Sequence, residues 1–86
     1  MNIDEISKLS EELKLQRFKK SKSQENCANL LGISIPTYRE LEYNPNKMSL
    51  EQAFKISEYL DWNLFEFFLN TVLHNAISNN STNQKE

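Results

Sequence analysis

The twenty residues from Ser23 to Glu42 constrain the fold of this chain more than any other segment. Their pattern predicts two short helices joined by a tight turn, with Gly32, the only glycine of the chain, directly after the first helix. Helices often end at a residue in the left-handed region, and glycine suits that position because it has no Cβ to clash. Ser23 and Ser34 can each cap a helix start. Pro36 falls in the first turn of the second helix, where a missing N–H costs nothing.

The inner side of this helix pair is predicted to be apolar. Ala28 stands where the two helices cross, and a larger side chain there would push them apart. The rest of the apolar side consists of Cys27, Leu31, Ile33, Tyr38 and Leu41. Two helices around such a turn form the helix-turn-helix unit, which can place its second helix in the major groove of DNA.

This pattern resembles the phage Cro and CI repressor family, also called the Xre-type helix-turn-helix. The resemblance covers about Leu13 to Phe68. Arg17 lies seven residues before Gln24, where the family carries an arginine, and Glu42 lies where the family carries its partner glutamate. The resemblance implies that Arg17 and Glu42 form a structural ion pair between the first and third helices.

The chain also departs from the family pattern. Tyr38 stands where isoleucine or valine is usual. Asn44 replaces a common glycine after the second helix of the pair, and Pro45 restricts the backbone of the residue before it. The loop from residue 43 to 48 is therefore predicted less sharply than the helices.

The remaining sequence adds helices on both sides, so we predict an all-α fold, a compact five-helix domain similar to Cro and CI. A first helix from about Ile3 to Lys19 is indicated by apolar residues at helical spacing. These residues are Ile3, Ile6, Leu9 and Leu13. Ser49 and Gln52 form a capping-box pattern that opens a fourth helix. Its inner stripe is predicted to be Leu50, Ala53, Phe54, Ser57 and Leu60.

A fifth helix, from about residue 63 to 77, is apolar over more than one face. A helix that is apolar nearly all round must be buried nearly all round, and so small a domain covers only one side of its last helix. We therefore predict a symmetric homodimer through this helix; closure of a monomer core by the same helix stays open. The predicted dimer interface comprises Phe65, Phe68, Leu69, Val72, Leu73 and Ala76. The domain then spans residues 1–77, and the polar residues 78–86 are predicted to be a disordered tail.

Length and composition exclude several classes of protein. Eighty-six residues suffice for one small domain, so no second domain for a small-molecule effector is expected. No stretch reaches the roughly 20 apolar residues that cross a membrane. One cysteine cannot form an internal disulfide, which favours a cytoplasmic protein. His74 is the only histidine, so neither a set of catalytic residues nor a metal site is expected. We therefore predict that the protein is not an enzyme and needs no cofactor.

The net charge of −2 is divided unevenly along the chain. Residues 1–13 hold four acids and one lysine, whereas the segment from Lys14 to Lys22 holds five bases and no acid. Such a segment beside the helix pair favours a local phosphate-facing patch. A solvated, lysine-rich helix end is the other interpretation, because cations are favourable near a helix C-terminus.

The candidate DNA-binding residues come mainly from the second helix of the pair. Its outer face and first turn present Ser34, Ile35, Pro36, Thr37, Arg39, Glu40 and Tyr43. The resemblance adds Gln24, because the family residue at this position commonly contacts the DNA backbone or braces the recognition helix. Arg39 can bond guanine or phosphate, and Glu40 can either accept from cytosine or be a repulsive charge relieved by Arg39. The candidate phosphate contacts are Lys19, Lys20, Asn44, Asn46 and Lys47.

The expected function is a sequence-specific, dimeric, DNA-binding transcriptional regulator. The resemblance implies a small Cro-like repressor of phage or mobile-element origin, reading a near-palindromic operator through the helix over residues 35–42. Two alternatives stay open because fold does not fix function. One is a restriction–modification controller protein of the same fold. The other is a protein-binding helix-turn-helix module, of the antitoxin or anti-repressor type, that does not rely on DNA.

Overall fold

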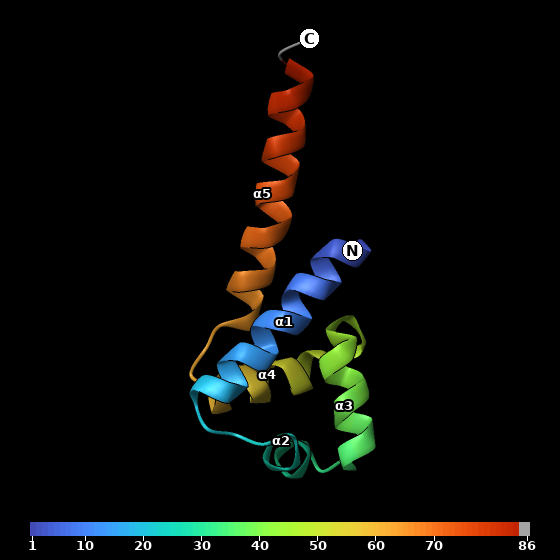
Figure 1. Cartoon of the computed structure of the whole chain (residues 1–86), viewed down its shortest axis with the longest axis vertical. Helices are drawn as coiled ribbons and strands as arrows, with labels where there is room; N and C mark the ends of the chain where they lie inside the picture. Colours follow the sequence, from blue (N-terminus) through green and yellow to red (C-terminus); the bar gives the residue numbers. More distant parts are fainter. Residues whose placement is uncertain (85–86) are drawn as a thin grey trace.

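The computed structural model describes the backbone of residues 1–84 and the side chains of residues 1–77. Within these residues the chain is all-α and forms five helices and one 3-10 turn, η1, in agreement with the predicted fold class. The elements are α1 (Ile3–Lys19), α2 (Gln24–Leu31), α3 (Ile35–Tyr43), η1 (Pro45–Lys47), α4 (Leu50–Tyr59) and α5 (Leu64–Gln84). Helices α1 to α4 gather into one body, and α5 leaves this body and rises beyond the start of α1 (Figure 1). The molecule is therefore elongated, with principal extents of 51 × 21 × 20 Å.

The helix starts are fixed by local side-chain caps, as the sequence predicted. The hydroxyls of Ser23, Ser34 and Ser49 accept from backbone N–H groups three residues later, at 2.9, 3.2 and 3.0 Å. The Asn63 side chain does the same for α5, at 3.0 Å. Each cap satisfies one of the backbone donors that a helix start leaves without a partner.

Three helix ends share one motif, in which a residue in the left-handed region closes the helix. After α2 this residue is Gly32, with φ of 67°. After α1 and α4 it is Ser21, with φ of 56°, and Asp61, with φ of 48°. Only the glycine could be predicted, because the other two residues adopt a conformation that their Cβ atoms disfavour. Asn44 at the end of α3 is not left-handed; its φ of −124° suits a residue that precedes proline.

The core lies where α1, α2, α3 and α4 meet. One cluster of fully buried side chains contains Leu13, Cys27, Ala28, Tyr38, Ile56 and Leu60. A second cluster, toward α5, contains Leu9, Ala53 and Leu64. Leu31 and Ile33 pack against the first cluster, and Leu41 is buried as well. The predicted apolar side of the helix pair is therefore confirmed.

The predicted inner stripe of α4 is wrong at two positions. Ala53 and Leu60 are buried, but Leu50 and Phe54 are exposed by 67% and 59%. Ile56 takes the inner position instead and is fully buried. Leu50 and Phe54 lie one turn apart on a flank of the helix, and the face centred on Ile56 is the one that packs into the core.

Helix α5 differs from the prediction in length. The sequence predicted its end near residue 77 and a polar tail beyond, whereas the structure continues the helix through Gln84. Residues 85 and 86 lie outside the described residues. Phe65, Phe67 and Phe68 pack against the second core cluster, so Phe65 and Phe68, two predicted interface residues, contribute to the domain's own core. No helix within the described residues combines the length and apolar character needed to cross a membrane.

Candidate nucleic-acid interface

Helix α3 is tied to α1 by a buried ion pair. Arg17 donates from Nε and Nη2 to the two carboxylate oxygens of Glu42, at 2.8 and 3.0 Å. The side chain of Glu42 is 1% exposed and that of Arg17 is 18% exposed. The ion pair that the resemblance implied is therefore present, in the bidentate geometry that gives an arginine–carboxylate pair its directional strength.

Two further bonds fix the ends of this ion pair to the backbone. Arg17 also donates from Nη1 to the carbonyl of Lys22, at 3.0 Å. The buried hydroxyl of Ser10 donates to the backbone carbonyl of Glu42, at 2.7 Å. The end of α3 is thus held by α1 and by the segment that precedes α2.

Gln24 connects this buried pair to the surface of α3. Its amide nitrogen donates to Glu42 at 3.2 Å, and its amide oxygen accepts from Nε of the exposed Arg39 at 3.2 Å. Because an ionised carboxylate only accepts hydrogen bonds, Glu42 orients the amide so that its oxygen faces Arg39. The first residue of α2 therefore braces an arginine on the outer face of α3.

The environment of Glu42 favours its charged form. Burial alone would raise the pKa of this carboxyl, but the hydrogen bonds from Arg17 and Gln24 outweigh burial and hold the pKa below its ordinary value. Beneath the pair, burial raises the pKa of Cys27 and of Tyr38. Both groups are therefore neutral, and Cys27 is a buried structural thiol as predicted.

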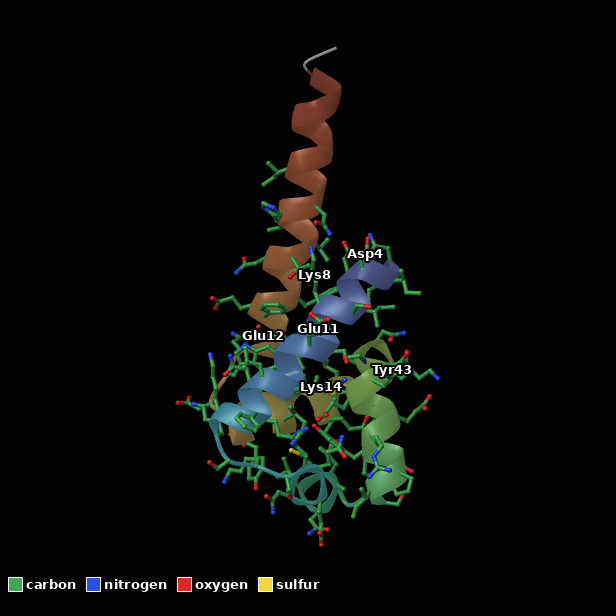
Figure 2. All side chains as sticks on the ribbon, in the orientation of Figure 1. Asp4, Lys8, Glu11, Glu12, Lys14 and Tyr43 are labelled. Atoms are coloured by element: carbon green, nitrogen blue, oxygen red, sulfur yellow. The ribbon has the colours of Figure 1, made fainter. Side chains whose placement is uncertain are left out.

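The outer face of α3 carries most of the predicted DNA-binding residues in exposed positions. Six of them are exposed: Ser34, Pro36, Thr37, Arg39, Glu40 and Tyr43. Ile35 is half-buried and packs against the first core cluster. Figure 2 shows Tyr43 at the end of α3 on the rim of the domain, where its side chain is 69% exposed.

Glu40 is paired with a lysine from the following turn. Its carboxylate accepts from Lys47 at 2.9 Å, and both side chains are more than half exposed. This contact, more than any other, lowers the pKa of Glu40. Lys47, which lies in η1, therefore compensates the negative charge of Glu40, a role that one of the two sequence interpretations gave to Arg39. The acid on the outer face is neutralised within the domain.

The predicted phosphate-contact residues lie on two separate segments. Lys19 and Lys20 are exposed at the end of α1, and Asn46 and Lys47 are exposed in η1. Asn44 is half-buried at the end of α3. Lys22 differs from the other lysines of its run, because its ammonium lies 4.7 Å from the centroid of the Tyr59 ring and so faces the domain's own surface.

Sequence reasoning missed three members of this network: Ser10, the carbonyl of Lys22, and the contact between Gln24 and Glu42. Ser10 shares its helical face with the apolar Leu13, which was the only available signal. Within residues 1–77 no group of histidine, cysteine or carboxylate side chains could hold a metal ion. No protein-family model, curated protein or solved structure matches this chain.

Proposed function

We propose that this protein is a sequence-specific DNA-binding regulator that reads a near-palindromic site as a homodimer, with α3 in the major groove. The observation that carries the proposal is the bracing of Arg39. Gln24 holds Nε, and among the described side chains the two terminal nitrogens of Arg39 have no partner. These two nitrogens form the fork that can donate to O6 and N7 of guanine.

The charges around α3 support the same function. Lys47 neutralises Glu40, so Arg39 is a cation that no acid of the described residues pairs. Lys19 and Lys20 are exposed near the start of α2 and can contact phosphates on the flank of the groove. The acidic net charge of the chain does not oppose binding, because its unpaired acids lie mainly on α1, α4 and α5.

The homodimer is supported by the large apolar side chains that the second half of α5 leaves exposed. The side that faces solvent carries Leu69, Leu73 and Ile77, which are exposed by 54%, 48% and 62%. On the side that packs against the domain, the apolar contacts come from the first half of the helix; further along, Asn75 donates to Glu5 of α1 at 3.3 Å. A helix that turns its apolar stripe outward needs a partner to cover it, and two antiparallel copies of one stripe satisfy a two-fold axis.

DNA binding is tested by selecting bound sequences from a random duplex pool. The expected result is a palindrome whose half-sites are about 34–36 Å apart, with one invariant guanine in each. Arg39→Ala should cost about 1–3 kcal/mol in binding to the selected site. The melting temperature of Arg39→Ala should equal that of the unmodified protein, because Arg39 is exposed. Lys55→Ala, on the remote surface of α4, is the matched control and should bind normally.

If no sequence is enriched and no duplex binds at low salt, the proposal is wrong. A protein-binding module would then be the remaining function for the exposed face of α3. If binding occurs but Arg39→Ala affects all duplexes equally, Arg39 contacts phosphate and does not read a base.

The dimer is tested by replacing one residue of the outward stripe. Leu73→Asp should leave the helical content intact and convert the dimer to a monomer in sedimentation velocity, because a carboxylate would have to be buried in an apolar interface. Asn29→Asp introduces the same charge at an exposed polar position on α2, away from α5, and should remain dimeric. Equal behaviour of the two variants would contradict an interface through this stripe.

A further inference from the structure

A second apolar surface lies away from α3 and begins one helical turn before Leu69, the first residue of the outward stripe of α5. It is a groove between α4 and the start of α5, lined by Leu50, Phe54, Trp62 and Phe65. The rings of Phe54 and Phe65 lie 4.8 Å apart, centroid to centroid. Phe54 and Leu50 are the residues that the sequence wrongly placed in the core. Exposed Leu50 and Phe54 beside the half-buried Trp62 and Phe65 form an apolar depression of the kind that marks a site of interaction.

The rim of this groove is acidic. Glu51, Glu58 and Asp61 all line it, together with Lys55. Lys55 is bonded to Glu51 at 3.2 Å. Within residues 1–77, Glu58 and Asp61 have no salt-bridge partner. A partner that fits the groove therefore brings an apolar anchor flanked by cations.

The end of α1 carries these features on the same chain. Phe18 is 78% exposed, more than any other large apolar side chain of the described residues, and Leu15 beside it is 45% exposed. Lys14 precedes Phe18 by one helical turn, and Lys19 follows it; both are exposed. We call these four residues the α1 knob. None of its side chains takes part in the Arg17–Glu42 network.

We propose that the groove is a docking site for the α1 knob of a second copy of this chain. Phe18 inserts beside Phe54 and Phe65, and Lys14 and Lys19 approach Glu58 and Asp61. The α5 helix of a second copy is a poorer occupant, because residues 64–84 contain Glu66 and no lysine or arginine. Burying Glu58 and Asp61 under an apolar helix would remove their hydration, and no cation on that helix would compensate for the loss.

This contact joins two different patches, so it is heterologous and links molecules head to tail. It is independent of DNA binding and of the outward stripe of α5. Where the α5 dimer also forms, the contact connects dimers into larger assemblies.

The test is sedimentation velocity over a range of protein concentrations, with Leu73→Asp present in every variant so that the α5 contact is removed. The knob variant is Lys14→Glu with Lys19→Glu. The groove variant is Glu58→Lys with Asp61→Asn, and asparagine keeps a residue that tolerates the left-handed region. Each variant alone should need at least about tenfold more protein to associate, because like charges would face each other.

Mixing the two variants should restore association, because the unmodified knob of the groove variant then meets the unmodified groove of the knob variant, and the reversed knob meets the reversed groove. A control with Lys8→Glu and Lys47→Glu carries the same net charge as the knob variant but leaves the knob intact. It should associate like the protein that carries Leu73→Asp alone. If either charge-reversed variant associates normally, or if the mixture does not recover, the proposal is wrong.

Two uncharged variants identify the occupant of the groove. Phe18→Ser and Phe54→Ser replace exposed side chains, so both should fold normally, and both should weaken association to a similar extent. If Phe54→Ser weakens association but Phe18→Ser does not, another segment occupies the groove. Absence of any association at the highest soluble concentration would also overturn the proposal.

Discussion

Removing Arg17 should expose how strongly the buried charge of Glu42 depends on its partner. Arg17→Ala deletes both bonds to the carboxylate and the bond to the carbonyl of Lys22. Glu42 then keeps one amide donor, from Gln24, for a side chain that is 1% exposed in the unmodified protein. Breaking a buried ion pair from one side costs about 3–5 kcal/mol.

We expect a value near the lower limit, about 3 kcal/mol, because the site borders solvent at Arg17 and water can enter where the guanidinium was. In a domain of this size, 1 kcal/mol shifts the melting temperature by about 4–8 °C, so the midpoint should fall by about 12–24 °C at pH 7. Lys55→Ala removes an exposed pair within one helix turn and should change stability by at most about 0.5 kcal/mol.

The pH dependence distinguishes a buried charge from a simple loss of packing. In the unmodified protein the pKa of Glu42 lies below its ordinary value of 4.5, so its stabilisation is complete above that pH and is lost as the pH falls through the folded-state pKa. In Arg17→Ala, burial dominates and the pKa of Glu42 should rise above 4.5. The variant should then gain stability relative to the unmodified protein as the pH falls from 7 toward 5.

The measurement is urea unfolding of both proteins at several pH values between 4 and 7. Glu42→Gln is the companion variant. It removes the charge and keeps the shape, so it should be less destabilised than Arg17→Ala at pH 7. Its difference in stability from the unmodified protein should stay constant between pH 7 and pH 5. A loss below about 1 kcal/mol in Arg17→Ala, or a difference that does not change with pH, would refute the reasoning.

Three further substitutions test other parts of the structure. Gln24→Ala should weaken binding to the selected site more than it weakens non-specific binding. Competition with random duplex measures the ratio of the two affinities, and an unchanged ratio would show that Arg39 does not need the contact with Gln24. Tyr38→Phe should keep or raise stability by up to about 1 kcal/mol in urea unfolding, because the buried hydroxyl has no hydrogen-bond partner among the described side chains; a loss of more than that would reveal a bond. Gly32→Ala should lower stability by about 1 kcal/mol because of its left-handed backbone alone, since no atom lies within 4 Å of an added Cβ. Ser21→Gly, at the equivalent position after α1, should raise the melting temperature. A stabilising Gly32→Ala or a destabilising Ser21→Gly would contradict the assignment of these helix ends.

The local features of the fold could be predicted from the sequence because they depend on residues close together in the chain. Ser23, Ser34 and Ser49 cap their helices through atoms three residues away, and Gly32 closes α2 because its own backbone is permissive. The pairing of Arg17 with Glu42 was inferred only from the family resemblance. Nothing local to either residue requires it.

The tertiary structure decided which faces are covered and which contacts cross between helices. Periodicity identified α4 as amphipathic but could not fix its rotation against α1 and α2, so Leu50 and Phe54 were placed in the core although they line an open groove. For Gln24 the resemblance left two roles open, contact with the DNA backbone or bracing of α3, and the sequence did not show which residues the brace would join. The role of Gln24 arises because the packing of α1 and α3 brings the buried carboxylate of Glu42 to one side of its amide and the exposed Arg39 to the other. A contact among three segments depends on packing that no single segment encodes.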